Sequence, residues 1–359
     1  MGWKKTPSVA QYGGADWSNL IHTEKNCTVE KAKRIAMLNP NITFFFFCNG
    51  QLVLDGHGTF DTDDAVFFSG EPWYGSAPQC DAYQKEDIAV LYINPNKSPN
   101  YPSPSAQFRA IADQPGVDIV SVFGANYVTN TSPYLRAENN PHATNQFNDN
   151  IQSLLDNNDI AYLQEKGIVV LLTILNGHQP VGWSQFTKEQ VAEDFANYLK
   201  NDVVDKYGFD GIDIDDEYSS GTPNDTSLIM VTSKMRAAMP DKLITKALFD
   251  DTTYFQSTWQ GKTLAENLDY GWEMSYFSPQ LGNRLSQYLA WGMKKNELCL
   301  GFSAEDRFSG YWSEYPGIAQ SVIENGFLGS MLFAYENQPD SVGVLNGLLQ
   351  GMSSAKTKA

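Results

Sequence analysis

The chain has 359 residues, of which 42% are hydrophobic and 19% are charged, so it can bury a sizeable core and is not typical of a disordered protein. Its formal net charge of −17 argues against a nucleic-acid backbone or an anionic membrane as partner, because both would repel it. Neutral partners such as sugars carry no such penalty. A (β/α)8 barrel typically takes about 250 residues, so one barrel and a smaller module are expected.

No run approaches the roughly 18 apolar residues of a membrane-spanning helix, and the opening MGWKKTPSVA lacks the apolar segment of a signal peptide. We therefore expect either a cytoplasmic protein or the mature form of a secreted one. Four cysteines, Cys27, Cys48, Cys80 and Cys299, are too few and too scattered for a disulfide framework or a paired-cysteine zinc site. They are expected to be buried or free thiols, and no metal or cofactor is expected.

The first part of the chain predicts a small α/β or mainly β module. TVEKAKRIAMLN predicts a helix capped by Thr28, and the runs ITFFFFCNGQLVLDG, DAVFFSG and DIAVLYI predict strands. In NPNKSPNYPSPS, Asn94 to Ser105, proline, serine and asparagine displace the apolar pattern. We therefore predict two domains, residues 1–105 and 106–359. The first has no catalytic motif, and its possible roles are carbohydrate binding, packing on the barrel and tethering the barrel to a partner.

After this break, strands alternate with helices, which predicts a (β/α)8 TIM barrel with its active site at the C-terminal ends of the strands. A short eighth strand is expected around HATNQFN. Helices are predicted in NDNIQSLLDNNDIAYLQEKG, TKEQVAEDFANYLKNDVVDKYG and NDTSLIMVTSKMRAAM. The seven clear strand runs are VDIVSVFGANY, GIVVLLTILNG, FDGIDID, LITKALF, LDYGWEMSYF, LCLGF and GSMLFAY.

The run FDGIDIDDE combines strand residues with many carboxylates. On one strand, alternation places Asp213, Asp215 and Glu217 on the same face and the intervening isoleucines on the other. With the isoleucines packed outward, the three acids form a ladder that points into the barrel, with Glu217 at its mouth. Asp216 lies off the ladder, and Asp210 is expected to fix the entry of the strand.

Three carboxylates at this spacing cannot all ionise cheaply, so shared protons and at least one raised pKa are expected. Glu217 is then a candidate general acid, while Asp213 can hydrogen-bond Asp215, which can turn toward Glu217 or a substrate amide. The alternatives are a calcium loop and a solvated acidic turn. A calcium loop of the EF-hand type would need its glycine after the first acids, whereas Gly211 precedes the ladder. Catalysis is favoured because the acids alternate with strand residues.

The segment DGIDIDDE resembles the Asp-Gly-x-Asp-x-Asp-x-Glu signature of glycoside hydrolase family 18. Four stretches, one of which contains this signature, are similar, in the same order, to segments of endo-β-N-acetylglucosaminidases of the Endo H kind. They are QFNDNIQSLLDN, LQEKGIVVLLTILNGHQPVGW, YGFDGIDIDDEY and LDYGWEMSYF. The resemblance runs over roughly residues 115–350 and leaves out the N-terminal module.

The resemblance implies that Glu217 protonates the glycosidic oxygen and that Asp215 orients the 2-acetamido group of the substrate. The acetamido oxygen then attacks the anomeric carbon, and an oxazolinium intermediate gives retention. Asp213 is implied as the proton partner of Asp215, and Tyr276 as a support for the acetamido group. The implied substrates are N-glycans or glycoproteins, cleaved at the β-1,4 bond of the chitobiose core.

Chitinases of the family commonly carry an aspartate after this tyrosine and a tryptophan on the last strand. Here the corresponding residues are Phe277 and, near the last strand, Tyr335 and Asn337, which favours the endoglycosidase group. Trp272 is predicted to stack on a sugar, and Tyr335, Asn337 and His178 are further candidate substrate-binding residues. The alternatives are a chitinase and a catalytically weak sugar-binding protein on the same barrel. The signature acids are all present, which favours an enzyme.

Overall fold

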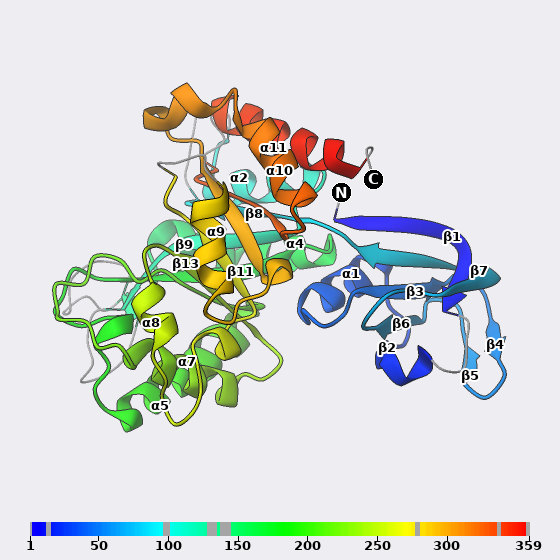
Figure 1. Ribbon diagram of the computed structural model, residues 1–359, viewed down its shortest axis with the longest axis horizontal. Coiled ribbons are helices and arrows are strands. Elements are labelled where there is room, and N and C mark those ends of the chain that lie inside the picture. Colours follow the sequence, from blue (N-terminus) through cyan, green and yellow to red (C-terminus); the bar gives the residue numbers. More distant parts are fainter. Residues whose placement is uncertain are drawn as a thin grey trace.

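The computed structural model contains a small N-terminal module and, beside it, a larger barrel of strands and helices (Figure 1). No helix in the described part of the chain is both long and apolar enough to cross a membrane. The structure describes residues 2–11, 16–95, 101–127, 135–136, 145–276, 281–335 and 339–356.

Eight parallel strands close into a barrel, which confirms the predicted fold. Strand β8 pairs with β16 on one side and with β9 on the other, and this pairing closes the ring. A short strand, β10 (Leu135–Arg136), pairs antiparallel with the end of β9. The barrel strands are β8 (Ile88–Ile93), β9 (Ile119–Tyr127), β11 (Val169–Asn176), β12 (Gly211–Ile214), β13 (Leu243–Leu248), β14 (Tyr270–Glu273), β15 (Leu298–Ser303) and β16 (Gly329–Phe333).

Seven barrel strands coincide with the predicted runs, but the eighth does not. The expected strand around residues 142–148 does not form in its described part, residues 145–148, and β8 completes the barrel instead. The predicted boundary at residue 105 placed the strand Ile88–Ile93 in the N-terminal module. The structure shows that this strand belongs to the barrel. An apolar run can indicate a strand, but its pairing depends on residues far away in the chain.

Alternation along the strands divides the apolar side chains of the barrel between two cores. Outward-facing residues such as Ile212 and Ile214 pack with the surrounding helices. Inward-facing residues such as Leu171 and Leu243 fill the barrel itself. Strand β12 follows this rule as predicted, because its isoleucines face the helices and Asp213 faces the interior.

The helices around the barrel largely match the predicted stretches. The stretch 148–167 forms two helices instead of one, because Asn158 between them has a left-handed backbone with φ of 56°. The stretch 187–208 ends at Gly208, whose φ of 78° is typical of a helix C-terminus. The helices are α1 (Val29–Met37), α2 (Pro104–Arg109), α3 (Asp149–Asp156), α4 (Asp159–Glu165), α5 (Glu189–Tyr198), α6 (Asp205–Tyr207), α7 (Ser227–Ala238), α8 (Thr252–Gln256), α9 (Leu281–Leu289), α10 (Tyr315–Glu324) and α11 (Pro339–Lys356).

The N-terminal module is a five-stranded antiparallel sheet with helix α1 on one face and a small hairpin on the other. In the buried strand β3, Phe45 and Phe47 face α1, and the other two phenylalanines face the hairpin side. Thr28 caps α1 as predicted, since its side chain accepts a hydrogen bond from the N–H of Lys31 at 3.1 Å. The sheet strands are β1 (Trp3–Gln11), β2 (Leu20–Glu24), β3 (Phe44–Cys48), β6 (Ala65–Phe68) and β7 (Tyr74–Lys85), and the hairpin strands are β4 (Leu52–Leu54) and β5 (Gly58–Phe60).

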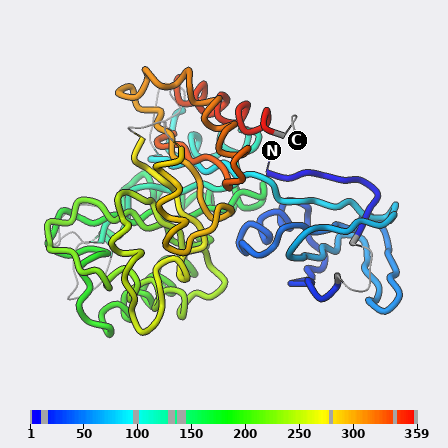
Figure 2. Tube along the Cα trace, viewed as in Figure 1, coloured from blue at the N-terminus to red at the C-terminus, as the bar shows by residue number. Residues whose placement is uncertain are grey.

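The helix of this module packs against the bottom of the barrel. The side chain of Met37, the last residue of α1, packs with the side chains that fill the barrel. The hydroxyl of Tyr270 donates a hydrogen bond to the backbone carbonyl of Met37 at 3.2 Å. The chain runs from β7 almost directly into β8 (Figure 2), so the module and the first barrel strand are continuous. The module therefore supports the end of the barrel opposite the mouth.

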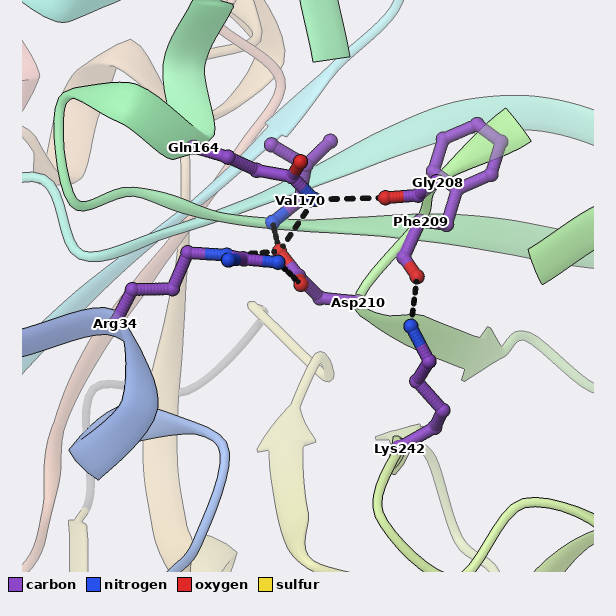
Figure 3. A network of polar contacts seen from close by, with 7 residues as sticks. All are labelled: Arg34, Gln164, Val170, Gly208, Phe209, Asp210 and Lys242. Atoms are coloured by element: carbon purple, nitrogen blue, oxygen red, sulfur yellow. Dashed lines mark hydrogen bonds and ion pairs between the residues drawn. The ribbon is translucent and has the colours of Figure 1, made fainter. Parts of the chain in front are cut away.

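Asp210, immediately before β12, joins the module to the barrel (Figure 3). Its wholly buried carboxylate forms an ion pair with Arg34 of α1. The same carboxylate accepts hydrogen bonds from the Gln164 side chain at 3.0 Å and from the N–H of Val170 at 2.9 Å. Asp210 therefore fixes the entry of the strand as predicted, and Arg34 is the partner that the sequence did not indicate.

We predict that Arg34→Ala lowers the free energy of unfolding by about 3 kcal/mol, because the Asp210 carboxylate stays buried without its counter-ion. Denaturant unfolding followed by circular dichroism measures this loss. Lys31→Ala is the matched control, because Lys31 lies on the same helix but pairs with Glu24 at the surface, where a loss below about 1 kcal/mol is expected. Equal losses in both variants would contradict a special role for the buried pair.

Candidate active site

Asp213 lies wholly buried inside the barrel, where side chains from four other strands donate hydrogen bonds to it. The hydroxyl of Tyr92 and that of Thr173 bind Oδ2 at 2.5 and 3.0 Å. The hydroxyl of Thr245 and the indole N–H of Trp272 bind Oδ1 at 2.6 and 3.0 Å. An ionised carboxylate has about four acceptor positions, so these donors occupy it fully and fix its orientation.

Two opposing effects act on the pKa of Asp213. Burial raises it, because the ionised form loses its hydration, and the four donors oppose the rise because they stabilise the anion. The hydrogen bond predicted between Asp213 and Asp215 does not form between these two described side chains. The donors on Asp213 already use its acceptor positions.

Asp215 lies just beyond β12, and its N–H donates a hydrogen bond to the carbonyl of Ile174 at 3.1 Å. The side chain is buried, and its Oδ1 has no hydrogen-bond partner among the described residues. Burial raises the pKa of Asp215 well above its usual range, and the negative charges of Glu217 and Asp213 raise it further. A buried oxygen without a donor, in a carboxyl that lines a pocket, is available to a bound ligand.

Glu217 is partly buried at the mouth of the barrel. Burial raises its pKa, while a hydrogen bond from Tyr218 and the positive charge of Lys246 act in the opposite direction. The direction agrees with the raised pKa predicted for the ladder, although its main cause at Glu217 is burial and not the neighbouring acids. A carboxyl that keeps its proton closer to neutral pH is suited to general acid catalysis.

Asp216 lies off the ladder, as predicted. Its carboxylate accepts hydrogen bonds from Asn176 at 2.8 Å and from Ser184 at 3.3 Å. The buried ammonium of Lys246 lies near these acids and forms an ion pair with Asp251 at 2.9 Å. The sequence analysis missed Lys246, although a lysine within the apolar run LITKALF was a usable signal.

A pocket of about 230 Å³ contains the two upper acids of the ladder. Its aromatic residues contact one another, since the ring of Phe333 lies 5.8 Å from that of Phe123 and 6.0 Å from that of Tyr276. The pocket therefore combines carboxyl groups with large apolar surfaces. It is lined by Tyr92, Phe123, Asp215, Glu217, Tyr218, Ala247, Phe249, Met274, Tyr276, Arg307, Met331 and Phe333.

Tyr276 lines this pocket three residues after β14, which ends at Glu273. Its backbone is left-handed, with φ of 47°, and its ring stacks on Phe333 at an interplanar angle of 18°. Burial raises the pKa of Tyr276 well above its usual range. The hydroxyl therefore stays protonated and can donate a hydrogen bond to a ligand.

Two predicted sugar-binding residues face elsewhere. Trp272 is wholly buried beneath the pocket and donates to Asp213, so it cannot stack on a sugar. Tyr335 is also wholly buried and packs in the outer core, because the chain has left β16 at Phe333. Asn337 lies outside the described residues. His178 is exposed near the mouth, and its ring stacks on Tyr218 at 5.0 Å.

The structure also brings in residues that the sequence analysis did not name. Phe333 on β16 contributes an aromatic surface to the pocket, and it shares the inward direction of Met331 on the same strand. Arg307 lines the pocket beyond β15, but no sequence pattern distinguished it from other surface arginines. Among the described residues, no group of three or more histidine, cysteine, aspartate or glutamate side chains has an arrangement that could hold a metal ion.

A family model described as the endo-beta-N-acetylglucosaminidase EndoS TIM-barrel domain matches residues 97–321. This span is more than half of the chain and contains Asp213, Asp215, Glu217 and Tyr276. The chain belongs to this family. Its barrel, its acidic strand and its pocket are thus those of a member of the endo-β-N-acetylglucosaminidase EndoS TIM-barrel family.

Two curated relatives carry related names. The chain is 37% identical over 167 residues to an endo-β-N-acetylglucosaminidase of Flavobacterium sp. (strain SK1022). The aligned segment covers 44% of this chain and 50% of the relative. It is 29% identical over 234 residues to endo-β-N-acetylglucosaminidase F1 of Elizabethkingia meningoseptica. This aligned segment covers 62% of this chain and 64% of that protein. The chain thus spans between half and two thirds of the length of these relatives.

Solved structures support the fold of this EndoS-family member. EndoBT-3987 of Bacteroides thetaiotamicron, solved with a Man5GlcNAc product, matches with a TM-score of 0.55 at 18% identity and covers 99% of this chain and 90% of its own. A fungal endo-β-N-acetylglucosaminidase from glycosyl hydrolase family 18 matches with a TM-score of 0.53 at 16% identity and covers 74% of this chain and 97% of its own. The first match extends over the N-terminal module as well as the barrel.

We predict that Asp215→Asn raises the free energy of unfolding at neutral pH, because the folded protein disfavours the ionised form of this carboxyl. The folded-state pKa lies above the unfolded-state value of about 3.9, so the unfavourable contribution appears as the pH rises past about 4. Below that pH both states are protonated and the gain should disappear.

Denaturant unfolding at several pH values between about 4 and 7 measures this gain. Asp205→Asn is the control, because Asp205 is exposed and pairs only with Lys200 at the surface, so little change is expected at any pH. A gain in Asp215→Asn that does not vary with pH would show that the cause is not the charge.

Proposed function

We propose that this protein is a glycoside hydrolase of family 18, of the Endo H kind, that cleaves the β-1,4 bond between the two GlcNAc residues of the N-glycan core. The observation that carries the proposal is the unpartnered, buried oxygen of Asp215 beside Glu217 in the pocket. The names of the family and of the curated relatives support it. EndoBT-3987, a structural neighbour, is known in complex with a Man9GlcNAc2Asn substrate.

Glu217 begins the proposed reaction as the acid. It gives its proton to the glycosidic oxygen while the bond between this oxygen and the anomeric carbon breaks. The carbonyl oxygen of the substrate's own 2-acetamido group attacks the anomeric carbon and forms an oxazolinium ion. Glu217, now a carboxylate, removes a proton from a water molecule that attacks the same carbon, and the configuration is retained.

Asp215 and Tyr276 hold the acetamido group in this proposal. The free oxygen of Asp215 accepts a hydrogen bond from the acetamido N–H, and its negative charge stabilises the positive oxazolinium ion. The Tyr276 hydroxyl donates to the acetamido oxygen and directs it toward the anomeric carbon. Asp213 lies below them and positions Asp215 through the fixed strand β12.

The substrate class also suits the surroundings of the pocket. A protein with a formal net charge of −17 attracts no anionic polymer, and uncharged glycans meet no repulsion. Aromatic lining residues such as Phe333 and Phe123 offer large apolar surfaces to sugar rings. We assign His178, which is exposed near the mouth, to contacts with the rest of the glycan. The substrate-binding role of Asn337, which lies outside the described residues, stays a prediction from the sequence.

The N-terminal module supports the barrel in this proposal. The contact of Met37 with the barrel core and the Arg34–Asp210 pair favour this role over carbohydrate binding, the other role predicted from the sequence. Among the residues of the module that the structure describes, none lines the pocket.

We predict that the protein releases glycans from a high-mannose glycoprotein and that Glu217→Gln lowers the rate at least about 100-fold while glycan affinity is kept. Electrophoretic shift and mass spectrometry of the released glycans measure cleavage, and calorimetry measures binding. Cleavage of chitin oligosaccharides alone would favour a chitinase. Glycan binding without cleavage by the wild type would favour a sugar-binding protein, and wild-type rates in Glu217→Gln would remove this residue from the acid role.

We predict that Tyr218→Phe moves the alkaline limb of the pH profile of kcat/KM to higher pH. The hydrogen bond from Tyr218 lowers the pKa of Glu217, so its loss lets Glu217 keep the catalytic proton at higher pH. Tyr311→Phe is the control, because Tyr311 is exposed and does not line the pocket. An unchanged limb in Tyr218→Phe would mean that another group controls it.

A further inference from the structure

Two of the four cysteines lie directly opposite each other in the N-terminal module. Cys48 is the last residue of β3, and it pairs across the sheet with Cys80 of β7. Their Sγ atoms are 2.9 Å apart, and both side chains are wholly buried. All four cysteines lie among the described residues, and no other two of them share a core cluster there.

The position of the two cysteines in the sheet suits a covalent bond. The N–H of Asn49 donates to the carbonyl of Gln79 at 2.6 Å, so the next residues, Cys48 and Cys80, form a non-hydrogen-bonded pair. The N–H of Cys48 accordingly points the other way, to the carbonyl of Asp64 at 2.9 Å. Such pairs have Cα atoms about 4.5 Å apart, within the roughly 4.4–6.8 Å that a disulfide spans.

The other two cysteines lack this arrangement. Cys27 lies in the cluster on the opposite face of the module's sheet, against α1. Cys299 lies inside the barrel, on β15. They are therefore natural internal controls, since they share the burial of Cys48 and Cys80 but have no second cysteine in their core clusters of described residues.

We propose that Cys48 and Cys80 form a disulfide bond that fastens β3 to β7. Its formation breaks two S–H bonds and makes one S–S bond, and the two thiols give up two electrons and two protons. A disulfide oxidant, such as glutathione disulfide or a disulfide oxidoreductase, accepts them and leaves as two thiols. Because both sulfur atoms are buried, exchange occurs while the module folds. This inference does not depend on the proposed function.

The bond has a structural consequence for the junction with the barrel. It closes the chain segment that contains β4, β5 and β6, which removes conformational freedom from the unfolded module. Helix α1, which carries Arg34, packs on this same sheet. The disulfide therefore stabilises the platform that holds Asp210, at a distance from the pocket, and it leaves the catalytic groups unchanged.

The full chain, produced in an oxidising compartment and alkylated on lysis, tests the proposal. We expect two free thiols in denaturant, Cys27 and Cys299, and a peptide map without reductant in which the Cys48 peptide is linked to the Cys80 peptide. The link should disappear after reduction. Four free thiols, or a link through Cys27 or Cys299, would overturn the proposal.

Thermal unfolding gives a second readout. Reductant should lower the midpoint of the wild type by about 5 °C, because the loop in the unfolded module is released. The double variant Cys48→Ala/Cys80→Ala should show no response to reductant, whereas Cys27→Ala should respond like the wild type. A response to reductant that persists in the double variant would assign the effect to other thiols and contradict the proposal.

Discussion

The buried carboxylate of Asp213 is the constraint on which the active end of the barrel depends. An ionised group inside a protein is tolerated only when donors replace its hydration, and here the donors come from β8, β11, β13 and β14. These hydrogen bonds connect β12 with strands on both sides and across the barrel. The residues that follow on β12, Asp215 and Glu217, are thereby held at the mouth with little freedom to relax.

The acids of β12 differ in what surrounds them, and the differences separate their properties. Asp213 has a donor for every acceptor position, Asp215 is buried with an oxygen that has no donor in the described part of the chain, and Glu217 is partly solvated. The unsatisfied oxygen of Asp215 destabilises the free protein. In the proposed function the same oxygen accepts a hydrogen bond from the substrate, so the folded protein loses stability at the site that is proposed to bind.

Much of this arrangement could be predicted, because it follows from local periodicity. The alternation in FDGIDIDDE was enough to place Asp213 inward, and the apolar runs located seven strands. The eighth strand could not be found in this way, because Ile88–Ile93 gains its barrel partners from residues far along the chain. The prediction that Trp272 stacks on a sugar was wrong for a related reason. Its side chain does face the interior of the barrel, but the depth of that side chain below the mouth depends on the stagger between neighbouring strands.

Strand β12 also connects the N-terminal module to the barrel structurally. Asp210 starts β12 and is neutralised by Arg34 from the module, so the strand is anchored by an ion pair at its base as well as by hydrogen bonds at Asp213. A domain boundary drawn from composition would separate Arg34 from Asp210 and leave the base of the strand with an uncompensated buried charge. The two parts of the chain therefore form one cooperative structure around the strand that carries the acids.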